Sequence, residues 1–234
     1  MTRKLANDCI EIWQADLNEY MFLKFNSYFQ VLSKEEKENA NSFKMDYHRK
    51  CYILSHVILR LLLSKYTGII PELIEIHKNK YGKPFIKSDK LKFNMSHSKG
   101  KLAIAMASFE VGIDIEYINP NFDIYEIIDI ALSESEKLNI KKLEFSLQKK
   151  QFYKYWTQKE AFLKAMGTGI NMDLNKLEIP NNTSDNNRIS IYKEKKWIIE
   201  PFNSFNKDYI GHIAYNDKNN KIIQYYKVQL SCVS

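Results

Sequence analysis

The sequence predicts an α+β protein, and three observations lead to this prediction. Two long stretches have the apolar periodicity of amphipathic helices, one in each half of the 234-residue chain. Several short, strand-like segments accompany each of them. Hydrophobic residues make up 44% of the chain, and only 7 glycines and 5 prolines interrupt it. We therefore expect regular elements around a sizeable core, rather than a disordered or low-complexity chain.

The first half opens with an alternating segment. Residues 9–17 predict a strand with Ile10 and Ile12 on the opposite face from Glu11 and Trp13. The elements expected after it are a helix that starts at a capping-box pattern at 33–36, a long helix over 46–66, and strands over 73–77, 91–95 and 102–107. We expect the 91–95 strand to end at a polar loop over 96–100.

The second half repeats this plan loosely. It begins with an acidic strand over 111–118, at the place where the two halves would join. The elements expected after it are a capped helix over 133–142, a long helix over 147–166, strands over 176–179, 188–193, 196–200, 209–215 and 222–230, and a polar loop over 181–187. No sequence repeat is strong enough to prove a duplication.

The charge of the chain indicates an anionic partner. The net charge is +7 and the isoelectric point about 9.0, which favours a nucleic acid, a phosphorylated small molecule or an acidic protein. The lysines are spread along the chain without a basic tail, so an electrostatic arm for nucleic acid is disfavoured.

The cysteines and the apolar runs indicate the compartment. Cys9, Cys51 and Cys232 lie far apart and form no metal-ligand pattern, which argues against a disulfide framework and is typical of a reducing cytosol. No signal-peptide pattern opens the chain, and the apolar run 57–63 is too short to span a bilayer. We expect a cytoplasmic protein without a membrane partner.

The acidic strand is the first candidate for chemistry. In Gly112-Ile113-Asp114-Ile115-Glu116 the two carboxylates share one face, roughly 6–7 Å apart by strand rise. They repel each other unless a positive group lies between them. The alternative, in which these residues have no functional role, is an edge strand with a solvated acidic face.

A second segment supplies the missing groups. In Trp156-Thr157-Gln158-Lys159-Glu160-Ala161-Phe162-Leu163-Lys164, the residues Trp156, Glu160 and Lys164 follow one face of the predicted helix. Three carboxylates and a cationic donor suit a hard divalent ion that holds a phosphate-bearing substrate.

Two further segments could contact such a substrate. Ser96-His97-Ser98 offers hydroxyl and imidazole donors of the kind that bind phosphate, whereas no nucleophile elbow or neighbouring acid supports a Ser-His nucleophile. Gly82-Lys83-Pro84 predicts a turn. The common glycine-rich nucleotide patterns are absent, so dispersed contacts would hold a nucleotide, among them Arg49 near a helix start.

Taken together and in this order, these segments resemble the phosphopantetheinyl transferases of the surfactin-synthetase-activating (Sfp-type) class. The matching motifs are Gly82-Lys83-Pro84, Asn94-Met95-Ser96-His97-Ser98, Gly112 to Glu116, and Trp156 to Lys164. The match covers roughly residues 43–170, and the last two motifs with their spacing are highly specific.

The resemblance implies the fold and the reaction. It implies a monomer of two similar α/β halves related by a pseudo-two-fold axis, with residues 1–110 contacting coenzyme A and residues 111–234 carrying the metal-binding strand and the catalytic helix. The enzyme would move the phosphopantetheine arm of coenzyme A to a serine of an acyl, peptidyl or polyketide carrier protein. Carriers of fatty-acid, polyketide and nonribosomal-peptide synthesis all remain open.

The resemblance also implies residue roles. Asp114, Glu116 and Glu160 would bind Mg²⁺, with Mn²⁺ as an alternative, and Glu160 would act as the base for the serine, directly or through water. Lys164 would steady the pyrophosphate. The coenzyme A contacts would be Arg49, Gly82, Lys83, Pro84, Ser96, His97 and Lys164. Residues 119–146 are expected to help dock the carrier, with Phe122, Ile124 and Ile127 as apolar contacts.

Two other classes remain as alternatives from the residues alone. A magnesium-dependent nuclease can also use an Asp-x-Glu strand with a nearby lysine, and it fits the basic charge. A nucleic-acid-binding module would use the many aromatic residues, but it leaves the three carboxylates unexplained. The transferase hypothesis predicts that nucleic acid is neither cleaved nor bound as a partner.

Overall fold

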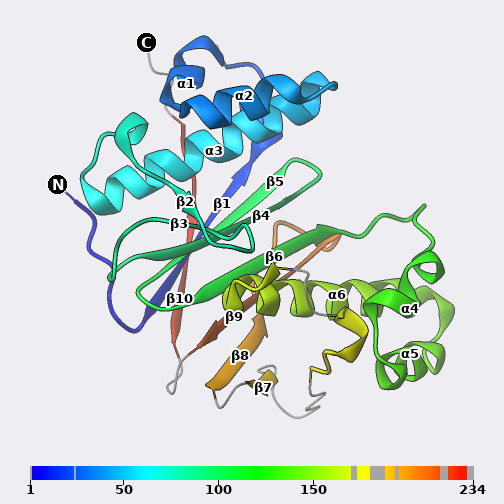
Figure 1. Ribbon diagram of the computed structural model, residues 1–234. Helices are drawn as coiled ribbons and strands as arrows, with labels where there is room; N and C mark the ends of the chain where they lie inside the picture. The colour runs from blue at the N-terminus through cyan, green and yellow to red at the C-terminus, as the bar shows by residue number, and fades with distance from the viewer. Residues whose placement is uncertain are drawn as a thin grey trace.

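The structure is a computed structural model that describes residues 2–23, 25–169, 173–179, 188–192, 195–216 and 221–230. Within these residues the chain forms two four-stranded sheets and a two-stranded hairpin, and a helix of 22 residues lies on each of the larger sheets (Figure 1). The α+β class predicted from the sequence is confirmed. The paired arrangement of one long helix and one sheet is what the expected two-fold relation of the halves requires.

The first sheet lies under the helix α3 (Asp46–Thr67). On α3, Leu54, Ile58 and Leu62 recur every four residues and pack against Trp13 of the sheet. Gly68 ends the helix in the left-handed region, at φ 76°, where a side chain would be strained. The strand order is β10 (Ile222–Lys227), β1 (Cys9–Asp16), β5 (Lys101–Ala107) and β4 (Lys92–Ser98), with β10 parallel to β1 and the other pairs antiparallel.

The second sheet lies under the helix α6 (Phe145–Met166), which packs over β6 and β9. The packing is close because β6 carries Gly112 beneath the helix. A Cβ at Gly112 would lie 2.1 Å from the carbonyl oxygen of Ala161 and 2.2 Å from the nitrogen of Ala165. The strand order is β6 (Val111–Tyr117), β9 (Tyr209–Asn216), β8 (Lys195–Pro201) and β7 (Arg188–Tyr192), all antiparallel.

The two sheets pack on each other through the faces that α3 and α6 leave uncovered. Ile10 and Ile12 of β1 join Ile113 and Ile115 of β6 in one buried cluster, whereas Trp13 faces α3. The alternation predicted for residues 9–17 is therefore confirmed. The layers follow one another as α3, first sheet, second sheet and α6.

Short elements cover the two ends of the molecule (Figure 1). Both predicted capping boxes are present, with Ser33 paired to Glu36 and Ser133 paired to Glu136. Buried Lys159 of α6 donates to the Glu136 carboxylate at 2.5 Å, and so ties the smaller helices to the long one. The remaining elements are α1 (Phe25–Val31), α2 (Lys34–Ser42), α4 (Ile128–Ala131), α5 (Glu134–Lys141), the strands β2 (His77–Lys78) and β3 (Pro84–Phe85), and 3-10 turns at Leu17–Tyr20, Pro71–Leu73, Ile124–Glu126 and Leu174–Lys176.

Three expectations about strands are wrong. At 73–77 only His77 lies in a strand, because buried Arg60 binds the carbonyls of Pro71 and Ile74 and holds that segment against α3. At 176–179 Lys159 similarly binds the Leu174 carbonyl, and a 3-10 turn forms. β4 does not end at residue 95 but continues through Ser98. The predicted loop 181–187 lies outside the described residues.

The division of the chain at residue 110 stays a prediction. The strand β10 complicates it, because this C-terminal segment pairs with β1 in the sheet of the N-terminal strands. Its register joins Ile222 to Cys9 and Lys227 to Gln14.

Candidate active site

The candidate site lies where the edge strands of the two sheets, β4 and β6, run side by side. Every second residue of β4 bonds the backbone of β6 with its side chain. The side-chain oxygens of Asn94, Ser96 and Ser98 accept hydrogen bonds from the backbone N–H groups of residues 113, 115 and 117, at 2.9, 3.4 and 3.1 Å. This side-chain ladder explains why β4 continues through Ser98.

The same hydroxyl groups hold the carboxylates of the acidic strand. Ser96 Oγ donates to Asp114 Oδ1 at 2.9 Å, and Ser98 Oγ donates to Glu116 Oε2 at 2.7 Å. Asp114 is only 2% exposed, and Lys164 Nζ lies 2.6 Å from its Oδ1. The strand therefore presents both carboxylates on one face, as predicted, and Lys164 compensates part of their charge.

Glu160 faces the same place from α6. Glu160 is 9% exposed. Its burial, and to a smaller extent the charge of Asp114, raises the pKa of its carboxyl group. Burial and then Asp114 also raise the pKa of Glu116, to about 7. The charge of Asp114 contributes to the raised pKa of both Glu160 and Glu116, as expected for carboxylates that lie close together in a partly buried place.

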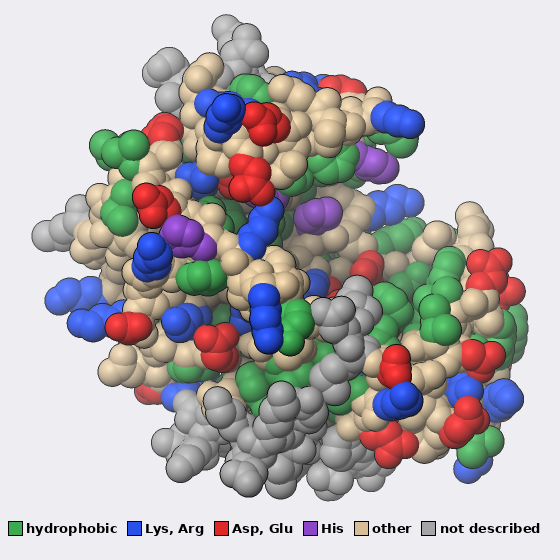
Figure 2. All heavy atoms as spheres, viewed as in Figure 1, with side chains coloured by type: hydrophobic (Ala, Val, Ile, Leu, Met, Phe, Trp, Pro, Cys, Tyr) green, Lys and Arg blue, Asp and Glu red, His purple; other side chains and the backbone are tan. Residues whose placement is uncertain are grey.

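A pocket of about 320 Å³ opens between these groups. Its walls come from β4, β6 and α6, and the residues that line it are Met95, Ser96, His97, Asp114, Glu116, Trp156, Glu160 and Lys164. Figure 2 shows the hollow between the surface formed by α1–α3 and the surface formed by α4–α6, with basic and histidine side chains along one wall. The structure therefore brings the three carboxylates and Lys164 to one pocket.

The donor set of this pocket fits a magnesium ion. Two carboxylate oxygens, Asp114 Oδ2 and Glu160 Oε1, are buried without a hydrogen-bond partner. Buried anionic oxygens without partners are costly unless a cation neutralises them. The fit lies in the chemistry of these oxygens and not in a preformed cage, because among the described residues no three histidine, cysteine or acidic side chains are already gathered around a metal position. Lys164 contacts Asp114 in their place.

His97 lies at the acidic pocket, whereas Arg49 lies outside it. The imidazole of His97 is exposed at the pocket mouth, and desolvation by its surroundings followed by the charge of Lys164 lowers its pKa. At neutral pH it is therefore an uncharged donor and acceptor. Arg49, in the first turn of α3, donates to Asn41 and its guanidinium lies over the ring of Phe29, outside the pocket.

The Gly82-Lys83-Pro84 turn is held against the end of α6. Lys83 Nζ donates to the Glu110 carboxylate at 2.9 Å and to the carbonyls of Val111 and Ala165 at 3.2 and 2.9 Å. These acceptors use all three donors of the ammonium group. Contact of this turn with coenzyme A stays a prediction, and it would come from the backbone and from Pro84 rather than from the ammonium.

An adjoining pocket of about 350 Å³ shares Glu116 and Trp156 with the acidic pocket. Two of the predicted docking residues, Phe122 and Ile127, line it. Ile124 is 3% exposed and packs in the core, because it faces Phe152 and Tyr155 rather than solvent. Its side chain is not available to a partner, so the docking prediction depends on the other two residues.

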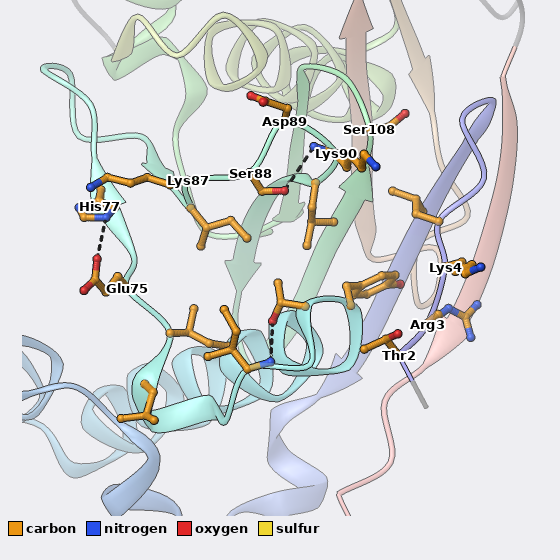
Figure 3. A pocket seen from close by; sticks show the side chains of 18 of the residues that line it. Thr2, Arg3, Lys4, Glu75, His77, Lys87, Ser88, Asp89, Lys90 and Ser108 are labelled. Carbon is orange, nitrogen blue, oxygen red and sulfur yellow. Dashed lines mark hydrogen bonds and ion pairs between the residues drawn. The ribbon is translucent and has the colours of Figure 1, made fainter.

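A larger cavity of about 1090 Å³ lies away from the carboxylates, at the other end of β4 (Figure 3). The N-terminal segment, the end of α3 and residues 86–91 form its walls, with Lys4, Lys87 and Lys90 among its lining residues. Nothing in its contacts selects one class of ligand. We place the chemistry in the smaller pocket because the acidic residues and Lys164 gather there.

Sequence reasoning missed three residues of this site. Asn94 belongs to a quoted motif but had no role, and Ser98 was considered only as a phosphate donor, because their bonds to β6 depend on two sheet edges that meet only in the fold. Gly112 had no role either. The signal that could have found the two polar residues is their period of two, shared with the acidic strand.

The comparison with known proteins identifies the family. Residues 13–110 match the family described as 4'-phosphopantetheinyl transferase, N-terminal, and residues 110–214 match the 4'-phosphopantetheinyl transferase superfamily. The chain is 31% identical over 172 residues to the 4'-phosphopantetheinyl transferase HetI of Nostoc sp., covering 71% of this chain and 72% of the relative. It is 31% identical over 167 residues to a 4'-phosphopantetheinyl transferase of Bacillus subtilis, covering 69% and 70%.

A third relative matches over a shorter part. The 4'-phosphopantetheinyl transferase gsp of Aneurinibacillus migulanus is 34% identical over 144 residues, which cover 62% of this chain and 58% of the relative. The matched families meet at residue 110, next to the acidic strand. This chain therefore belongs to the 4'-phosphopantetheinyl transferase superfamily, and it is an enzyme of the Sfp-type class.

Proposed function

We propose that Asp114, Glu116 and Glu160 bind Mg²⁺ in this transferase and that Glu160 is the base for the acceptor serine. The enzyme transfers the phosphopantetheine arm of coenzyme A to a serine of a carrier protein and so converts the apo form to the holo form. The observation that carries the proposal is the pair of buried, unpartnered oxygens on Asp114 and Glu160.

The reaction is a displacement at phosphorus. The serine oxygen forms a bond to the phosphorus that carries pantetheine, the bond from that phosphorus to the bridging oxygen breaks, and adenosine bisphosphate leaves. Such a reaction requires cationic groups that neutralise the charge on the phosphate oxygens, and an aligned nucleophile. A bound magnesium ion supplies charge neutralisation at the pyrophosphate, on the order of several kcal/mol.

The side chains of the pocket fit the remaining tasks. The Glu160 carboxylate lines the pocket, where it can accept the proton of a serine hydroxyl. The side chain of Lys164 is 29% exposed, so its ammonium group can bind a phosphate in addition to Asp114. Uncharged His97, with Ser96, can donate hydrogen bonds to the same phosphates.

The carrier would approach over the adjoining pocket. Phe122 and Ile127 offer apolar contact next to Glu116, and the net charge of +7 favours an acidic carrier protein of any of the three pathway types. We also propose a cytoplasmic monomer, because one chain supplies both walls of the site. None of the described helices has the length and apolar character needed to cross a membrane.

The test is carrier loading read by intact mass. The protein is incubated with coenzyme A, MgCl₂ and a panel of apo acyl, peptidyl and polyketide carriers, with single-stranded DNA and RNA in parallel. We expect one phosphopantetheine per carrier and intact nucleic acid. Asp114→Asn and Glu160→Gln keep the shape of the side chains, and we expect each to slow loading by about 10²-fold or more.

Glu72→Gln is the matched control, since Glu72 is an exposed carboxylate away from the pocket. A second readout is the melting temperature, which Mg²⁺ or Mn²⁺ should raise in the wild type but not in Asp114→Asn. Normal loading by either site variant would refute the assignment of these carboxylates.

A further inference from the structure

A buried histidine that the reaction does not use lies beneath the acidic pocket. His212 is 3% exposed on β9, and its register partner on β6 is Asp114. The side chains of directly paired residues in an antiparallel sheet point to the same face. For this pair it is the face that α6 covers, because the ring of His212 contacts two residues of that helix.

The ring of His212 bonds the helix through both of its nitrogens. Nδ1 lies 2.7 Å from Thr157 Oγ1, and Nε2 lies 3.2 Å from Gln158 Nε2. Both partners are buried, at 0% and 3% exposed.

The hydrogen-bond inventory assigns the protons of this network. The Thr157 hydroxyl lies 2.7 Å from the carbonyl of Tyr153 and donates its single proton there. Thr157 Oγ1 then accepts a hydrogen bond from Nδ1–H of His212, and the Gln158 amide donates one to the unprotonated Nε2 of the same ring. One neutral imidazole thus joins β9 to α6 with both nitrogens bonded.

This bridge fixes the helix on one side of Glu160, and Gly112 fixes it on the other. At Gly112 the backbone of α6 touches β6 around Ala161 and Ala165, where no Cβ would fit. At Thr157, one turn earlier, the ring of His212 stands between sheet and helix. Glu160 lies between these two contacts. The distance between α6 and the sheet at each contact therefore determines how closely the Glu160 carboxylate approaches Asp114.

We propose that His212 is a positioning residue of the transferase. It holds α6 at the distance from the sheet, and in the rotation about the helix axis, that bring Glu160 to Asp114 for metal binding. It acts through Thr157 and Gln158 and touches neither coenzyme A nor the carrier. This inference rests on the proposed function of the carboxylates. A displacement of about 1 Å in a catalytic group can cost on the order of 10² in rate, so a residue of this kind is visible in kinetics.

The experiment compares His212→Ala, His212→Asn and Thr157→Val. The amide of asparagine reproduces the Nδ1–H donor, and valine removes the hydroxyl of Thr157 while keeping its shape. For each variant we measure kcat, KM for the carrier, and the Mn²⁺ dissociation constant by electron paramagnetic resonance. His77→Asn, a change outside the acidic pocket, is the control.

We expect His212→Ala to lower kcat by roughly 10- to 100-fold and to weaken Mn²⁺ binding, with KM for the carrier unchanged within about twofold. His212→Asn should restore most of both losses, and Thr157→Val should reproduce part of them. A merely structural histidine would lower the melting temperature and leave the kcat and Mn²⁺ affinity of the folded protein unchanged. That result in His212→Ala overturns the inference, and so does wild-type behaviour of Thr157→Val if His212→Ala does not fold.

Failure of the proposed function looks different. If Asp114→Asn and Glu160→Gln load carriers normally, the carboxylates are not the metal ligands and the inference falls with them. If those two variants are inactive and the His212 and Thr157 variants match the wild type, only the positioning role is rejected.

Discussion

At the junction of the two sheets, three side chains of β4 replace the backbone carbonyls of a continuous sheet. Asn94 is the most enclosed of them at 4% exposed, and its Oδ1 accepts the backbone N–H of Ile113. Ser96 and Ser98 accept a backbone N–H in the same way, and each also donates to a carboxylate of the site. These residues therefore connect the stability of the junction with the orientation of the acidic groups.

Removal of the Asn94 amide should separate these two contributions. In Asn94→Ala the buried N–H of Ile113 loses its acceptor, and we expect a loss of about 1–3 kcal/mol in the free energy of unfolding. Carrier loading should fall less than in Asp114→Asn, because both serines remain. Urea denaturation and loading rates check this, with Asn121→Ala, an exposed asparagine, as the control. An unchanged denaturation midpoint would contradict the role of the amide.

The sequence allowed part of the site to be predicted at this scale. Asp114, Glu116, Glu160 and Lys164 could be grouped because strand and helix periods place them on defined faces and because the motif spacing is specific. The partners of Lys83 could not be predicted. Its acceptors at Glu110, Val111 and Ala165 come from segments that only the tertiary fold brings together.

At the scale of elements, the approach of α6 to β6 determines the site. The helix backbone rests directly on Gly112, and this contact brings Glu160 and Lys164 within reach of Asp114. The glycine of the Gly-x-Asp-x-Glu motif is thus required for packing, since its φ lies outside the left-handed region. The motif therefore combines the glycine on which α6 packs with the carboxylates that face the side chains of α6.

Gly112→Ala should displace α6. Its Cβ would meet backbone atoms at 2.1 and 2.2 Å, which no side-chain rotation can relieve. We expect a loss of about 1–3 kcal/mol or more in stability and a fall in loading of at least tenfold in the fraction that stays folded. Thermal unfolding and single-turnover loading measure the two effects. Gly68→Ala is the comparison, because it lies away from the acidic pocket, its Cβ would meet only the side chain of Thr2, and the change otherwise adds only backbone strain. Equal behaviour of the two variants would be evidence against the contact.

The two long helices and most strands could be predicted, because their periodicity is sustained and because a glycine, Gly68 or Gly167, ends each long helix. The failures at 73–77 and 176–179 have one cause. In each, a buried cation, Arg60 or Lys159, binds the backbone carbonyls of an apolar segment and draws it onto a helix. Such tertiary bonds override a strand pattern that is correct by composition.

At the scale of the whole molecule, the chain closes on itself. β10 returns to β1, and the ring of Tyr226 stacks on Trp13 with centroids 4.6 Å apart. The guanidinium of Arg3 lies near both rings, 5.2 Å from the Trp13 centroid and 4.3 Å from the Tyr226 centroid, and its Nε donates to Glu11. Both ends of the described chain therefore contribute to the first sheet.

Deletion of residues 221–234 should destabilise the entire protein. It removes a six-residue parallel ladder and exposes β1, whose Ile10 and Ile12 are fully buried. We expect the melting temperature to fall by about 10 °C or more, since ~1 kcal/mol corresponds to ~2–4 °C at this size, with aggregation through the free edge. Calorimetry and size-exclusion chromatography check this, and Ile222→Ser, at a 58% exposed position, is the control. A monomeric truncation with wild-type melting would contradict it.

The pairing of Ile222 with Cys9 has a consequence for synthesis of the protein. During translation β1 is made well before its parallel neighbour β10. The nascent chain must therefore wait with one side of a central strand open until β10 has been synthesised and can cover that side.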